Sequence, residues 1–208
     1  MKVVISIGGS IIASPINPDY IKKFSALLTK LRSEGYKPMV VVGGGRLARE
    51  YIEAAKKLGA SDDYCDEIGI AATKMNAMLL VSALGSNASK NIRVTGGIKP
   101  GQTTDAVAAE LAGKCKAKLL IIATNVAGVY DSDPNKNPSA KKFDSLNSEQ
   151  LLKIVGREYY PGLAAVIDPI AAKIIHRNKI KTIVIDGRKL RNIENAVKGK
   201  RHGGTVIE

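Results

Sequence analysis

The sequence predicts an α/β fold with a mainly parallel sheet that is covered on both faces. Apolar runs rich in Val and Ile alternate along the chain with segments whose apolar residues recur at helical spacing. The runs are apolar at successive positions, as in strands that are buried on both faces of a sheet. Strands that alternate with helices build parallel sheets.

The first half of the chain contains two of these strands and three helices. In order we expect a strand at 2–7, a helix at 18–33, a strand at 37–42, a helix that opens at the triple glycine 43–45, and a long helix at 66–84. Gly35 ends the first helix, because glycine readily takes the conformation that closes a helix. Residues 85–91 are polar and flexible in character.

The second half repeats the alternation around a long loop. In order we expect a short strand at 92–95, a helix at 103–115, a strand at 118–124, a loop at 128–140, helices at 147–154 and 168–178, a strand at 181–185, a helix at 189–197 and a last strand at 204–207. The helix at 168–178 begins with Asp168-Pro169, and proline suits the first helical turn. No linker is long enough to separate independent domains.

Composition limits the classes of partner. Lys and Arg number 32 against 19 Asp and Glu, a formal net charge of +13, which suggests polyanionic ligands. The basic residues are scattered, form no nucleic-acid motif and come with only 4% aromatic residues, so nucleic-acid binding is disfavoured. Small phosphorylated ligands explain the charge equally well, as does a merely basic surface.

Metal, redox and membrane functions are also disfavoured. Cys65 and Cys115 lie far apart and outside any CxxC pattern, which favours reduced thiols in a cytosolic protein. His176 and His202 cannot form a zinc site with so few ligands at such spacing. The chain starts on a strand rather than a signal peptide, and no apolar run is expected to reach membrane-spanning length.

Three strands end in glycines, at 8–9, 43–45 and 96–97. A glycine turn leaves bare backbone N–H groups at the strand end, where an anionic ligand can approach closely. The ends of parallel strands share one edge of the sheet, so these amides should converge on one site. Each turn alone could be a simple strand–helix turn, but their recurrence favours a site built around phosphates.

A dinucleotide site is the competing interpretation of the second turn. Residues 43–48 fit G-x-G-x-x-A, which expects an acidic residue at the end of the next strand, roughly 20 residues on. Asp62, Asp63 and Asp66 lie near that distance but open a helix, and an earlier strand already has its own glycine turn. The ATP-loop pattern G-x-x-x-x-G-K-[ST] is absent.

Other polar residues have both a structural and a functional interpretation. Arg49, one turn into the helix after the triple glycine, is a solvated side chain or a cation for phosphoryl oxygens. The segment 99–105 either caps the following helix or binds the phosphate or sugar of an acceptor. Asp131 and Asp133 are at least turn formers beside Pro134.

These residues together resemble the amino-acid kinase superfamily, and within it the archaeal-type uridylate (UMP) kinases. The matching motifs, in order along nearly the whole chain, are Ile7-Gly-Gly-Ser10, Val42-Gly-Gly-Gly45 with Leu47-Ala48-Arg49, Asp66-x-Ile-Gly69-Ile, Asn76-Ala-Met-Leu-Leu, Pro100-Gly-x-Thr-Thr-Asp105-Ala, Thr124-Asn-Val-x-Gly-Val-Tyr130-x-x-Asp133-Pro134, Val166-Ile-Asp-Pro-x-Ala-Ala-Lys173 and His202-x-Gly-Thr205. The resemblance implies a three-layer α/β/α sandwich in which residues 1–208 form one domain. Its part at about 1–115 would form the acceptor and phosphate side, and its part at about 116–208 would form the ATP side.

The resemblance also implies a reaction and a set of site residues. The protein would be a cytoplasmic homohexamer that transfers the γ-phosphoryl group of ATP to UMP, with Mg²⁺ on the ATP phosphates and no metal ligands of its own. ATP would be bound by Gly8, Gly9, Ser10, Gly45, Arg49, Thr124, Asn125, Tyr130 and Asp133, of which Gly9, Ser10 and Arg49 would be catalytic. UMP would be bound by Gly44, Asp66, Lys99, Pro100, Gly101, Gln102, Thr103, Thr104 and Asp105.

Two departures from the family pattern stand out. Many members carry lysine where this chain has Ser6, so Arg49 and Mg²⁺ are the candidate cations over the transferring group. Relatives also carry a strand and a helix before the third glycine turn, whereas in this chain only about ten residues separate residue 84 from that turn. The junction at 89–93 is abrupt, which favours residues left out of the printed sequence over a true loss of this strand and helix. The alternatives are a carbamate or isopentenyl phosphate kinase, or a non-catalytic nucleotide- or oxyanion-binding protein.

Overall fold

The computed structural model describes residues 1–132, 134, 136–156 and 167–208. The elements, in chain order, are β1 (Lys2–Ile7), α1 (Gly9–Ile12), α2 (Pro18–Ser33), β2 (Lys37–Val42), α3 (Gly45–Lys57), α4 (Asp62–Ser89), β3 (Arg93–Thr95), α5 (Thr104–Cys115), β4 (Leu119–Thr124), β5 (Ser145–Leu146), α6 (Ser148–Val155), α7 (Pro169–Asn178), β6 (Thr182–Asp186), α8 (Leu190–Val197) and β7 (Thr205–Ile207).

The strands form one sheet in the order β3-β2-β1-β4-β6-β7-β5. All neighbours are parallel except β6 and β7, which run antiparallel. The central register pairs Ile7 with Val42 on one side and with Ala123 on the other, so the carboxyl ends of three strands meet at one edge. The predicted mainly parallel α/β sheet is therefore confirmed.

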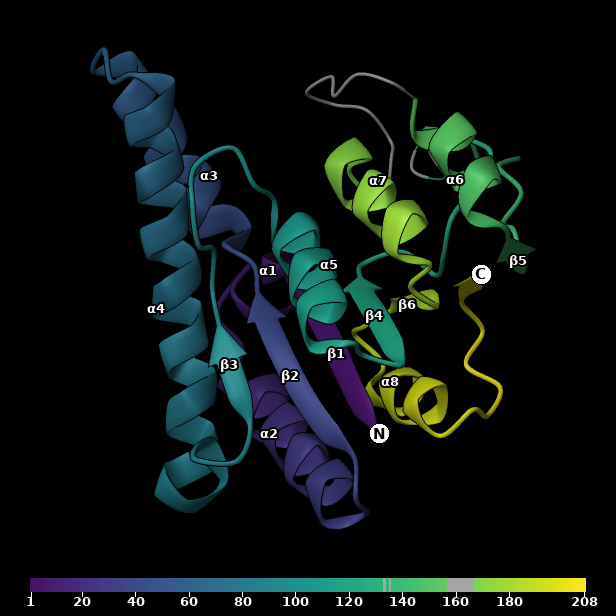
Figure 1. Ribbon diagram of the computed structural model, residues 1–208. Helices are drawn as coiled ribbons and strands as arrows, with labels where there is room; N and C mark the ends of the chain where they lie inside the picture. The colour runs from purple at the N-terminus through teal and green to yellow at the C-terminus, as the bar shows by residue number, and fades with distance from the viewer. Residues whose placement is uncertain (133, 135, 157–166) are drawn as a thin grey trace.

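Helices cover both faces of the sheet and make three layers (Figure 1). Alternate residues of β1 separate the two sides of the core: Val3, Ile5 and Ile7 pack with α2 and α8, whereas Val4 packs with α5, α6 and α7. α4 runs beside β3 and contacts α2 and α3. Ser6 follows the Val4 side of β1, which places it under α5.

Three predicted boundaries near α4 were wrong. The helix expected at 66–84 runs from Asp62 to Ser89, because Ser61 caps its start by accepting from the Tyr64 amide. The polar segment 85–91 is helical through Ser89, with an interruption at Gly85, where φ is 71°. Residues 90–92 then lead directly into β3. The four-residue α1 and the two-residue β5 are too short to have a periodic signal in the sequence.

The expectation that no segment reaches membrane-spanning length was also wrong. α4 has 28 residues and a mean hydropathy of 1.4 in its most apolar window, enough by length and composition to cross a membrane. Only 33% of that window is buried in the chain. Its buried side packs against α2 and holds polar groups of the site described below, so its apolar residues serve at least partly as core.

Candidate active site

The first two glycine turns extend the sheet ladder beyond the ends of their strands. Gly8 donates its amide to the carbonyl of Ala123 (2.9 Å), and Gly43 donates to that of Ile7 (2.9 Å). The Gly187 amide after β6 likewise donates to Thr124 (2.8 Å). The turns at the ends of β1 and β2 are thus held side by side at the carboxyl edge, as the sequence predicted.

These two turns touch through their backbones. A Cβ on Gly9 would lie 2.6 Å from the Gly43 carbonyl oxygen and would also overlap the nitrogen of Gly45. Gly45 itself has φ +70°, and a Cβ there would lie 2.5 Å from the Gly9 oxygen. Within the described residues the amides of Gly9, Gly44 and Gly45 donate no hydrogen bond to a neighbouring element, so they remain available to an anion.

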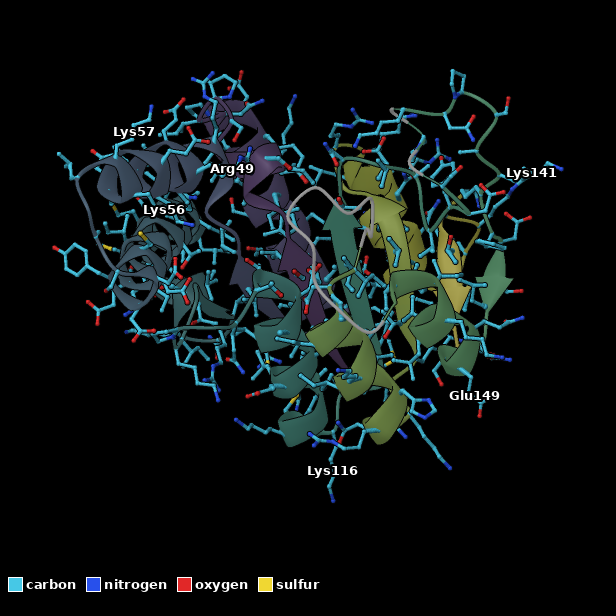
Figure 2. The ribbon with its side chains drawn as sticks, turned by 90° about the horizontal axis from the view of Figure 1, so that it is seen from above. Arg49, Lys56, Lys57, Lys116, Lys141 and Glu149 are labelled. Atoms are coloured by element: carbon cyan, nitrogen blue, oxygen red, sulfur yellow. The ribbon has the colours of Figure 1, made fainter. Side chains whose placement is uncertain are left out.

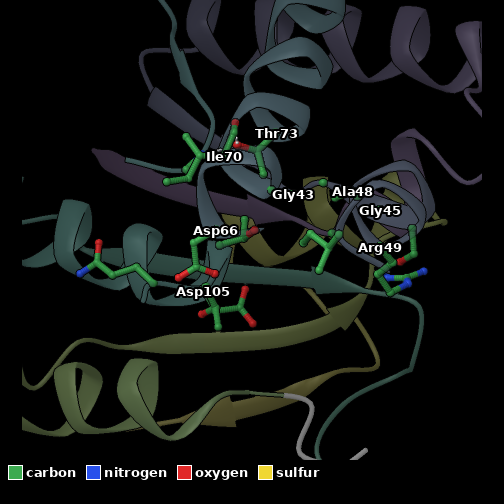
Figure 3. A pocket seen from close by; sticks show the side chains of 18 of the residues that line it. Gly43, Gly45, Ala48, Arg49, Asp66, Ile70, Thr73 and Asp105 are labelled. Atoms are coloured by element: carbon green, nitrogen blue, oxygen red, sulfur yellow. Dashed lines mark hydrogen bonds between the residues drawn. The ribbon is translucent and has the colours of Figure 1, made fainter. Parts of the chain in front are cut away.

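A cavity of about 470 Å³ opens over the turns (Figure 3). It is lined by Gly8, Gly9, Ser10, Gly43, Gly44, Gly45, Ala48, Arg49, Ile52, Asp66, Gly69, Ile70, Thr73, Gly97, Lys99, Gln102, Thr103, Thr104 and Asp105. The structure therefore brings residues predicted for the ATP phosphates into one cavity with residues predicted for the acceptor.

Helix α3 carries Arg49 to this cavity (Figure 3). Figure 2 shows the position of Arg49 in the whole molecule. The helix starts at Gly45, and the Arg46 amide in its first turn donates to Ser14 Oγ (2.6 Å). Arg46 forms an ion pair with Glu50 (3.1 Å), whereas Arg49 has no carboxylate partner within the described ranges. Arg49 is exposed, so its guanidinium is free to meet an anionic ligand.

The opposite wall is the predicted acceptor segment. Gly101 donates its amide to Asp66 Oδ2 (2.7 Å), which ties the segment to α4. Thr103 caps α5 by accepting from the Ala106 amide (3.1 Å), and its hydroxyl donates to Asp168. Asp168 in turn caps α7. Asp168, which the sequence predicts as a helix start, therefore also supports the wall of the site.

Asp105 lines the cavity, and the buried Ser6 supports it from the strand beneath. Ser6 donates its hydroxyl to Asp105 Oδ1 (2.6 Å). Burial raises the pKa of Asp105 to about 6, the hydrogen bond from Ser6 opposes the rise, and repulsion from Asp168 adds to it. Asp105 thus accepts from a hydroxyl and is repelled by a second carboxylate, that of Asp168.

Other predicted residues do not line this cavity. Pro100 and Gly101 belong to the acceptor wall without facing the cavity. Thr124 is the last residue of β4, and Asn125 follows it on the loop. Tyr130 bridges to Lys142 as an isolated β-pair, and Asp133 lies outside the described residues.

Sequence reasoning missed several lining residues. Gly69, Ile70 and Thr73 follow Asp66 by three, four and seven residues, and Ile52 follows Arg49 by three; Ala48 directly precedes Arg49. That spacing was a usable signal once Asp66 and Arg49 had been chosen. In the described part of the chain, three or more His, Cys, Asp or Glu side chains nowhere gather into a possible metal site.

The chain is similar in sequence to known kinases along its whole length. A sequence profile of the amino acid kinase family matches residues 1–98 and 87–186. The uridylate kinases of Archaeoglobus fulgidus and Thermococcus sibiricus are 48% and 45% identical to the chain, over 223 and 227 aligned positions that cover both proteins completely. These alignments are longer than the 208 residues of the chain, so the relatives have positions with no counterpart in it.

The fold also resembles those of solved uridylate kinase structures. The crystal structure of the Archaeoglobus fulgidus uridylate kinase matches with a TM-score of 0.88, with both chains fully covered. That of the UMP kinase from Bacillus anthracis matches with a TM-score of 0.83 at 20% identity, covering all of this chain and 95% of the other, and at that identity indicates a shared fold alone.

Proposed function

The chain belongs to the amino acid kinase family and is a uridylate kinase within it, and from this premise we propose that it transfers the γ-phosphoryl group of ATP to UMP, giving UDP and ADP. The observation that carries the proposal is the single cavity that joins the two touching glycine turns, Arg49 and the acceptor segment. In the proposed single domain, residues 1–115 form the side that holds the acceptor and the transferred phosphates, and residues 116–208 form the side that holds the rest of ATP.

Positioning and charge neutralisation account for the transfer. The nucleophile is an oxygen of the UMP phosphate, which is already ionised, so no strong base is needed. We propose that the Gly9, Ser10 and Gly45 amides and Arg49 hold the ATP phosphates, while the Gly44 amide faces UMP. Fixed donors of this kind stabilise charge on the phosphoryl oxygens without reorganising during the reaction.

The acceptor wall supplies groups for the rest of UMP. Asp66 uses Oδ2 to hold Gly101, which leaves its other oxygen to accept from a ribose hydroxyl. We assign the UMP phosphate, ribose and base to the segment that contains Lys99, Pro100, Gln102, Thr103, Thr104 and Asp105. Lys99 is exposed at the mouth of the cavity and adds positive charge there.

The donor loop and a metal ion complete the proposal. Thr124, Asn125, Tyr130 and Asp133 would line the adenosine side of ATP. The cavity offers the hydroxyls of Ser10 and Thr104 and the carboxylate of Asp105, hard oxygen donors that suit Mg²⁺ held mainly by substrate phosphates. When bound, Mg²⁺ would neutralise phosphate charge.

We further propose a cytoplasmic homohexamer. α4 exposes a run of apolar side chains toward solvent, namely Tyr64, Met75, Met78, Leu79 and Val81. An exposed apolar face of this kind is typical of a surface that is covered in an assembly.

The test is an acceptor panel with purified protein, ATP and Mg²⁺. UMP, CMP, carbamate and isopentenyl phosphate are compared by the rate of ADP release and by product analysis. We expect UDP as the main product. Absence of UDP, or a strong preference for another acceptor, would refute the proposal.

A further inference from the structure

Asn76, in the middle of α4, makes contact with the triple-glycine turn from behind. Its side chain is 1% exposed, and its Nδ2 donates to the carbonyl oxygens of both Gly43 (2.8 Å) and Gly44 (3.1 Å). We propose that Asn76 is a positioning residue, which fixes the direction of this turn so that its amides point into the cavity. The proposal rests on the proposed function, because it assigns those amides to substrate phosphates.

The planar peptide bond explains how the contact works. In a trans peptide the carbonyl and the following N–H point in opposite directions. Holding the Gly43 oxygen therefore directs the Gly44 amide away from Asn76, and holding the Gly44 oxygen does the same for the Gly45 amide. Gly44 and Gly45 both line the cavity.

The turn needs this restraint because it consists of glycines. Glycine allows either direction of the peptide at little cost, so an unrestrained peptide could rotate. A rotated peptide would present a carbonyl oxygen to the phosphates and repel them. Both Asn76 contacts use the one amide nitrogen, and only a donor can hold two carbonyls.

The third glycine turn is held by the same helix, one turn earlier. Thr73 Oγ1 accepts from the Gly97 amide (2.6 Å) while its hydroxyl donates to the Ile70 carbonyl (2.6 Å). Gly96 packs so closely that a Cβ would lie 2.5 Å from Thr73 Oγ1. α4 is therefore a common support for two turns that face the two substrates.

The test replaces the donor without changing its size. Asn76→Asp presents an acceptor to the two carbonyls, and Asn87→Asp makes the same change at an exposed position of α4. We expect Asn76→Asp to lower kcat on the order of 10- to 100-fold at pH 8, with a smaller effect on the KM for UMP, and Asn87→Asp to match the wild type. As pH falls, protonation of Asp at this position restores one donor, so the ratio of variant to wild-type kcat should rise.

Calorimetric titration measures the affinity for ADP, which does not depend on UDP formation. It therefore tests the positioning role of Asn76 separately from the proposed function. Weaker ADP binding by folded Asn76→Asp supports the positioning role even if the wild type forms no UDP. If the Asp variant does not fold, Asn76→Ser keeps a shorter donor and should retain intermediate kcat and ADP affinity. A folded variant with wild-type kcat and ADP affinity at pH 8, or a ratio of kcat values that does not change with pH, would overturn the proposal.

Discussion

At the scale of single residues, Arg49 gives the sharpest prediction. It is the arginine that lines the cavity, and it has no carboxylate partner in the described ranges. Arg49→Ala removes a cation from the transferring phosphoryl group, so kcat should fall by on the order of 10²–10³. Steady-state rates with UMP and ATP measure the effect.

The matched control is Arg46→Ala. Arg46 lies one helical turn earlier and is paired with Glu50 outside the cavity, so this variant should leave kcat nearly unchanged. Equal losses of kcat in both variants would contradict the role assigned to Arg49.

Asp105 gives a prediction about stability and pH. Its pKa of about 6 exceeds the usual 3.8, so the folded chain binds more protons than the unfolded chain between these values. The preference of the folded chain for the protonated carboxyl therefore stabilises it fully below about pH 4, and this stabilisation is lost as the pH rises through 6. Asp105→Asn should raise the free energy of unfolding at pH 8 by up to about 3 kcal/mol.

Denaturant unfolding at two pH values checks this sign. The increase in the free energy of unfolding caused by Asp105→Asn should shrink toward zero at pH 4, where the Asp105 carboxyl of the folded wild type is already protonated. Asp63→Asn, an exposed change on α4, should alter the free energy of unfolding by only a few tenths of a kcal/mol. A gain for Asp105→Asn that is the same at both pH values would show that the buried charge is not its cause.

At the scale of elements, the contact between the first two glycine turns is predicted to tolerate no side chain. Gly9→Ala would force its Cβ into the backbone of the second turn and displace both turns from the cavity. We expect kcat/KM to fall at least 100-fold, since a displacement of about 1 Å can have that effect. The control is Gly113→Ala in α5, where the nearest neighbour is the Asn178 side chain at 3.3 Å and alanine favours the helix. Normal activity of Gly9→Ala would refute the described contact.

The sequence predicted those elements and site residues whose signals are local. The buried strands, the glycine turns and the cap at Thr103 all follow from patterns a few residues long, and the structure bears them out. The roles of Ser6, Asn76 and Asp168 depend on partners 99, 33 and 65 residues away, so no local pattern reveals them. The end of α4 was missed because polar residues and Gly85 look like a loop, whereas the helix resumes after it.

At the scale of the whole molecule, the exposed apolar face of α4 leads to a prediction about assembly. Met78 is 70% exposed and lies near the middle of a helix whose most apolar window is only one-third buried. If this face is covered by another copy of the chain, a buried charge there is unfavourable. Met78→Glu should therefore reduce the mass measured by light scattering from that of the proposed hexamer, six times 22.1 kDa, to that of a smaller species. Leu58→Glu introduces the same charge at the 87% exposed end of α3 and should leave the mass unchanged. If Met78→Glu still forms a hexamer, the subunits associate through another surface. If the wild type is a monomer, the proposed assembly is refuted. The residues of the cavity all come from one chain, so the smaller species should still form UDP.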